Sequence, residues 1–107
     1  MTVMLLNQQV GVNMAIVKRV VLDVLKPHQP NALEFACELA DLGSEYQVDL
    51  LVKEIDDKTQ TIELTISADN INFEVVSNHI KTMGGAIHSI DEVAVLSSKP
   101  SEAEQHS

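Results

Sequence analysis

The chain has 107 residues, the size of one domain with one hydrophobic core. Hydrophobic residues make up 45% and charged residues 21%, which excludes a wholly disordered chain. The formal net charge of -9 and the aromatic content of 3% argue against a nucleic-acid-binding protein, because the charge repels phosphates and few rings are available for base stacking.

The two ends differ in composition from the middle of the chain. Residues 1–13 contain a short apolar stretch with no basic segment before it, so we expect a flexible leader and not a signal peptide. Residues 97–107 are small or polar and predict a disordered tail. Residues 14–96 would then form the domain. No apolar run is long enough to span a bilayer, and the single Cys37 excludes an intramolecular disulfide. We therefore expect a cytoplasmic protein.

The first half of the domain predicts a strand, a helix and a second strand. Residues 15–26 are dense in valine, isoleucine and leucine without a helical period, and Pro27 and Pro30 end this strand. Pro30 with Asn31 opens a helix that Gly43 ends. Residues 46–53 then alternate between apolar and polar and predict the second strand. The apolar stripe of the helix would consist of Leu33, Ala36, Leu39 and Ala40, with Phe35 beside it.

The second half repeats this pattern after a polar turn at residues 56–58. Residues 61–67 alternate again, which predicts a hairpin with the preceding strand. Asp69 or Asn70 can cap a second helix, which Gly84 and Gly85 end. Residues 86–96 form the fourth strand. The apolar residues of the second helix recur at spacings of three and four: Phe73, Val76, Ile80 and Met83.

The order strand, helix, strand, strand, helix, strand predicts an α+β, ferredoxin-like βαββαβ fold. This fold is a four-stranded antiparallel sheet with both helices on one face. Right-handed crossovers place the first and third strands in the middle, the fourth beside the first and the second beside the third. Residues 26–28 and 84–88 should then be neighbours, about 4.8 Å apart at closest, and the turn at residues 56–58 should lie roughly 14 Å from the fourth strand.

Two segments carry a resemblance to a known family. Residues 21–28, VLDVLKPH, and residues 83–93, MGGAIHSIDEV, resemble a small, mainly archaeal family known as domain of unknown function two hundred and eleven. The similarity covers about residues 15–95. It implies a ferredoxin-like fold and assembly into homo-oligomers or rings, and it implies no established activity.

The end of the predicted sheet near the first loop carries the main candidate site. By the topology, Lys26, His28 and His88 lie there together, which suits a small ligand. Imidazole nitrogen is a ligand for transition metals, and a further oxygen donor could be Asp91, Asp23 or a carboxylate of a neighbouring subunit. The alternative interpretation is that His28 bonds to backbone in a proline-bracketed turn and that His88 packs at the start of a strand. No spacing typical of a closed tetrahedral site supports the metal.

The acidic turn offers a second candidate metal site. Asp56 and Asp57 supply hard oxygen ligands for calcium or magnesium, but the segment lacks the twelve-residue loop of an EF-hand. A solvated hairpin turn explains the same residues, because aspartate favours turns. The sequence does not identify a cofactor, and a divalent cation, either calcium or a transition metal, is the candidate that these residues suggest.

Apolar residues on both faces of the predicted strands indicate association. An antiparallel sheet covered on one side should be polar on the other. Only the third strand, with Thr61, Glu63 and Thr65, follows that rule, so we expect a homo-oligomer, formed through the uncovered face or the edge strands. The leading hypothesis is a non-enzymatic, self-assembling ligand-binding or regulatory domain whose metal ion or small molecule lies at subunit boundaries. The alternatives are a small enzyme with a histidine acid or base, and a purely structural oligomerisation module.

Overall fold

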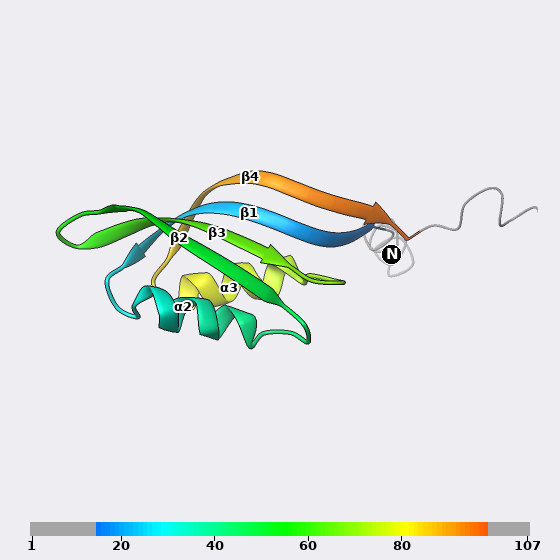
Figure 1. Cartoon of the computed structure of the whole chain (residues 1–107), viewed down its shortest axis with the longest axis horizontal. Coiled ribbons are helices and arrows are strands. Elements are labelled where there is room, and N and C mark those ends of the chain that lie inside the picture. The colour runs from blue at the N-terminus through cyan, green and yellow to red at the C-terminus, as the bar shows by residue number, and fades with distance from the viewer. Residues whose placement is uncertain (1–14, 99–107) are drawn as a thin grey trace, which may run out of the picture.

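The computed structural model describes residues 15–98, which form one sheet and two helices (Figure 1). The predicted leader and nearly all of the predicted tail lie outside these residues. In chain order, the elements are β1 (Ala15–Pro27), α2 (Ala32–Ala40), β2 (Gln47–Ile55), β3 (Thr59–Ser67), α3 (Phe73–Thr82) and β4 (Ala86–Ser97).

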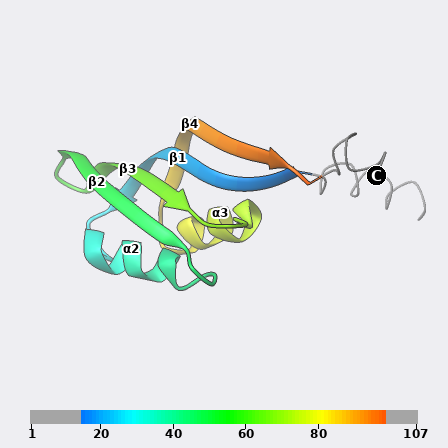
Figure 2. The same ribbon diagram turned by 45° about the vertical axis from the view of Figure 1, so that its right-hand side comes forward.

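The sheet has the strand order β2-β3-β1-β4, and each neighbouring pair is antiparallel. Both helices lie on one face of the sheet, as the two views show (Figures 1 and 2). The predicted ferredoxin-like fold and its strand order are therefore confirmed. In both views β1 and β4 extend beyond helix α3 at the end where β1 begins.

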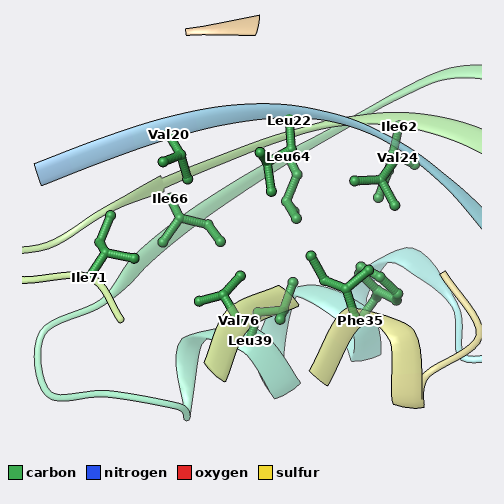
Figure 3. Packing of buried hydrophobic residues seen from close by; sticks show 11 residues of the cluster. Val20, Leu22, Val24, Phe35, Leu39, Ile62, Leu64, Ile66, Ile71 and Val76 are labelled. Carbon is green, nitrogen blue, oxygen red and sulfur yellow. The ribbon is translucent and has the colours of Figure 1, made fainter. Parts of the chain in front are cut away.

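The core lies between the sheet and the helices (Figure 3). From Val20 to Lys26 the even-numbered residues of β1 point towards the helices, as do those of β3, since Leu22 pairs with Leu64 and both are fully buried. Phe35 and Leu39 of α2 are also fully buried, whereas Leu33 is 73% exposed. The predicted stripe on this helix is therefore wrong at Leu33, whereas Leu39 is buried as predicted and Phe35, expected beside the stripe, belongs to the core. The core residues are Val20, Leu22, Val24, Phe35, Leu39, Ile62, Leu64, Ile66, Ile71, Val76 and Ile80.

The helix ends show how the sequence fixes the element boundaries. Asn31 and Glu34 form a capping box at the start of α2. Helix α3 begins later than expected, because its cap is Asn72 and neither Asp69 nor Asn70. At its end the Gly85 N–H donates to the Ile80 carbonyl at 2.8 Å, the pattern of a glycine-terminated helix.

The β1–β4 pairing contains three irregularities that change which residues share a face. Two of them insert His88 and Asp91 into β4 as extra residues, and the third lies at Lys18 of β1. As a result Ile87, Ile90 and Val93 lie opposite Val24, Leu22 and Val20 and all face the helix side. The spacing on one face of β4 is therefore three residues where a regular strand has two.

The helices of residues 15–98 are short. The longer one, α3, has 10 residues, and no helix in this part of the chain has the length and apolar character that crossing a membrane requires.

Candidate functional site

Lys26 is a buried lysine at the end of β1. Its side chain is fully buried, and Nζ donates hydrogen bonds to the carbonyl oxygen of Pro27 at 2.7 Å and to Oε1 of Gln60 at 3.3 Å. Nζ also lies 5.5 Å from the centre of the Phe35 ring, a favourable cation–π distance. Burial lowers the pKa of Lys26, and the negative charge of Glu34 partly opposes this shift. The amine is thus enclosed and held by internal acceptors.

His28 connects the loop after β1 to the turn between β2 and β3. Its Nε2 lies 2.8 Å from the carbonyl oxygen of Asp56 and 3.1 Å from that of Asp57. Because carbonyl oxygens only accept, Nε2 carries a proton and donates to both. The interpretation in which His28 bonds to backbone agrees with this contact, although the partner is the distant hairpin turn and not its own loop.

His88 and Asp91 lie on β4, where each is an extra residue of an irregularity in the pairing. Both are exposed, and the Asp91 carboxylate accepts a hydrogen bond from the Ser89 hydroxyl at 2.7 Å. The two backbone segments meet as predicted, since Leu25 pairs with Ala86 and a side-chain carbon at Gly84 would lie 3.0 Å from Pro27. The His28 ring, however, is bonded to the β2–β3 turn and not to β4.

The described residues of one copy do not assemble a metal site. Within residues 15–98, no three His, Cys, Asp or Glu side chains cluster closely enough to hold a metal ion. The Asp56 and Asp57 side chains are exposed, and the Asp56 N–H donates to the carbonyl of Thr59 at 2.8 Å, as in an ordinary hairpin turn. Both metal assignments from the sequence therefore stay predictions that need ligands from outside the described chain.

One histidine–carboxylate contact lies elsewhere, between the two helices. His79 Nε2 of α3 is 2.9 Å from Glu38 Oε1 of α2. The two residues are 41 positions apart in the chain, so the fold brings them together. The two side chains are 29% and 58% exposed, so this pair links the outer surfaces of the helices.

A cavity of about 540 Å³ lies where β1 begins, next to the start of α3. Sequence reasoning did not find it, because its walls come together only through the fold. The hydrogen bond from the Ile71 N–H to the Val17 carbonyl, at 2.9 Å, holds these two walls side by side. The cavity is lined by Ala15, Val17, Asn70, Ile71, Asn72, Phe73 and Glu74.

Exposed aliphatic side chains form a row along β4. Ile90, Val93 and Val95, which we call the β4 row, are 52%, 55% and 53% exposed. Ile90 and Val93 pair with the buried Leu22 and Val20 of β1, so they lie on the helix side of the sheet where neither helix reaches them. From the sequence we expected the exposed apolar side chains to lie on the uncovered face of the sheet. The structure corrects this expectation in part, because the Val21 side chain lies on that face and is only 7% exposed.

The uncovered face carries ion pairs between neighbouring strands. Arg19 of β1 pairs with Glu92 of β4, and Lys53 of β2 lies 3.9 Å from Glu63 of β3. All four side chains are at least 39% exposed, so each pair contributes little to stability. This face therefore presents charged side chains to water beside the exposed Leu51.

Comparison with known proteins agrees with the resemblance seen in the sequence. A sequence model of the DUF211 family, described as Uncharacterized ArCR, matches residues 18–104. The chain is also similar to Uncharacterized protein MJ0319 of Methanocaldococcus jannaschii, with 42% identity over 77 residues, which is 72% of this chain and 79% of the relative. The chain belongs to the DUF211 family.

Proposed function

We propose that this protein is a non-catalytic, cytoplasmic, self-assembling domain whose subunits associate through strand β4. The observation that carries the proposal is the β4 row, three aliphatic side chains that are each more than half exposed on an edge strand. Apolar patches of this kind usually mark sites of association. Burial of the row against a second copy would remove these side chains from water.

The free edge of β4 supports the same contact. Strand β4 is the last strand of the sheet and pairs only with β1 among the described residues. Both extra residues of β4 lie before Glu92, so the stretch from Glu92 to Leu96 is a regular strand. Two such stretches can pair antiparallel about a twofold axis, which would join two sheets into one of eight strands and place the two rows side by side.

A second apolar exposure lies near the opposite edge of the sheet. Leu33 at the start of α2 is 73% exposed and Ile55 at the end of β2 is 66% exposed. Strand β2 is the other edge strand. Contacts at both edges would carry the assembly beyond a dimer, and closed symmetry would then give a ring.

The ligand in this proposal is a divalent cation at the boundary between subunits. His88 and Asp91 favour it, because both are exposed on the strand that would form the contact. Each copy would supply an imidazole nitrogen and a carboxylate, ligands that suit transition metals and calcium respectively. Lys26 and His28 contribute less to such a site, because both already donate hydrogen bonds to carbonyl oxygens within the same chain. Native mass spectrometry with and without added calcium or zinc tests this part.

The self-association test compares two charge substitutions. Val93→Asp places a carboxylate in the β4 row, and Leu51→Asp places one on the uncovered face at a residue of similar exposure, 59%. We expect the unaltered chain and Leu51→Asp to sediment as oligomers at tens of micromolar and Val93→Asp to shift to the mass of one chain. Circular dichroism checks that both variants fold. A single-chain mass for the unaltered protein, or an unchanged oligomer in Val93→Asp, would contradict the proposal.

A further inference from the structure

We propose that residues 1–14 of this chain, which are the predicted leader together with Met14 and are called the leader from here on, cover the β4 row and the cavity beside Ala15 within the same molecule, and so compete with a second copy for that surface. The inference rests on the proposed self-association, because the leader and the second copy would use the same side chains. The leader would thereby regulate assembly.

The position of the cavity is the first argument. Ala15 lines the cavity and is joined directly to residue 14, so the leader starts at the cavity wall. Val17 lines it as well, and Val17 pairs with Val95, the last member of the β4 row. The cavity and the row are therefore continuous through a single strand pair, and a chain that leaves Ala15 meets both.

The composition of the leader is the second argument. Residues 1–14 contain no Asp, Glu, Lys or Arg, in a chain whose net charge is -9. Uncharged side chains can approach a surface that carries Glu74 at the cavity and Asp91 and Glu92 on β4 without the repulsion that acidic residues would meet. The other end of the chain, KPSEAEQHS, offers charged and polar residues instead. The apolar residues of the leader are Met1, Val3, Met4, Leu5, Leu6, Val10, Val12 and Met14.

Length and attachment are the third argument. Val95 and Ile90 are five positions apart, which in a strand is about 17 Å, whereas an extended leader reaches roughly 45 Å. Attachment at Ala15 makes the contact intramolecular, with an effective concentration on the order of millimolar. The family match begins at residue 18, so this cover would be a property of this chain outside the matched region.

The test weakens the proposed apolar contact between the leader and the β4 row without changing the length of the leader. Leu5→Asn with Leu6→Asn removes apolar side chains, and Gln8→Asn with Gln9→Asn is the matched control in the same segment. If the leader covers nine molecules in ten, both partners of a dimer must uncover, so the apparent dissociation constant of self-association is about a hundredfold higher than that of the uncovered form. We therefore expect sedimentation to show association up to about a hundredfold tighter in the leucine variant and no change in the control.

A second measurement separates the failure of this inference from the failure of the proposed self-association. In dilute, single-chain samples, we expect nuclear Overhauser contacts between leader methyl groups and the methyl groups of Val93 and Val95. These contacts should be lost in the leucine variant and kept in the glutamine control. Self-association that is equal or weaker in the leucine variant, or absence of these contacts in the unaltered protein, would overturn the cover by the leader. A chain that stays single in every variant but shows the contacts would overturn the self-association alone.

Discussion

Replacement of Lys26 by methionine tests the claim that burial disfavours its charge. The side chain is fully buried, its Nζ has two carbonyl-type acceptors, and its aliphatic stem extends the row of core residues Val20, Leu22 and Val24. Methionine keeps the length of the stem, so at pH 7 we expect the free energy of unfolding to change by less than about 1.5 kcal/mol. Lys26→Ala removes the stem as well and should cost about 2–5 kcal/mol.

The pH dependence of Lys26→Met gives the sharper result. Burial lowers the pKa of Lys26 in the folded protein below its ordinary value of 10.5, which the unfolded chain keeps. Between these two values the unfolded state binds the extra proton, so the stability of the unaltered protein rises with pH there, by at most about 1.4 kcal/mol per pH unit. At pH values below the pKa of Lys26 in the folded protein, the buried charge destabilises the fold to its full extent. At pH values above 10.5 this destabilising effect is absent.

The assay is urea unfolding of both proteins at several pH values from 7 to 11. Other titrating groups are common to the two proteins, so they cancel in the difference between the two free energies of unfolding. We expect this difference to move in favour of the unaltered protein as the pH rises. A constant difference, or one that moves in favour of Lys26→Met, would refute the reasoning that desolvation dominates at this lysine.

Three further local contacts are tested by thermal or urea unfolding. His28→Ala should cost about 1–2 kcal/mol because it removes the donor to the β2–β3 turn, whereas His88→Ala on exposed β4 should stay within about 0.5 kcal/mol; equal effects would contradict the contact. Asn72→Ala should cost about 1 kcal/mol as the loss of a helix cap, and Asn70→Ala should not. Gly84→Ala should cost about 1–2 kcal/mol because Gly84 has a φ of 87°, and a neutral effect would show that this turn relaxes.

The element order was predictable because local periodicity decides it. In β3 the alternation of Ile62, Leu64 and Ile66 with polar residues matches the burial in the structure. The spacing of Val76 and Ile80 likewise matches the buried face of α3. The start of α3 was not predictable, because three capping residues lie close together and a tertiary contact chooses among them. The Ala68 and Ile71 N–H groups bond to β1, which keeps this segment extended until Asn72.

The candidate site was less predictable than the fold. Topology correctly placed the segments after β1 and before β4 side by side, but strand order does not fix side-chain direction in a loop, and His28 bonds to the other hairpin. The burial of Lys26 follows the even-numbered alternation of β1, which the sequence left open between two faces. The β4 row was hidden because Ile90 and Val93 are three positions apart, and a spacing of two assigns them to opposite faces.

The three extra residues in the β1–β4 pairing also bear on how the chain reaches its native alignment. A regular ladder can slide by two positions and still keep its apolar side chains on the correct face. Here His88, Asp91 and Lys18 interrupt the ladder at unequal intervals, so a displaced alignment would set each interruption against a regular stretch of the opposite strand. Only one alignment accommodates all three, which makes the pairing of β1 with the edge strand β4 resistant to slippage even though the two strands are long and rich in valine.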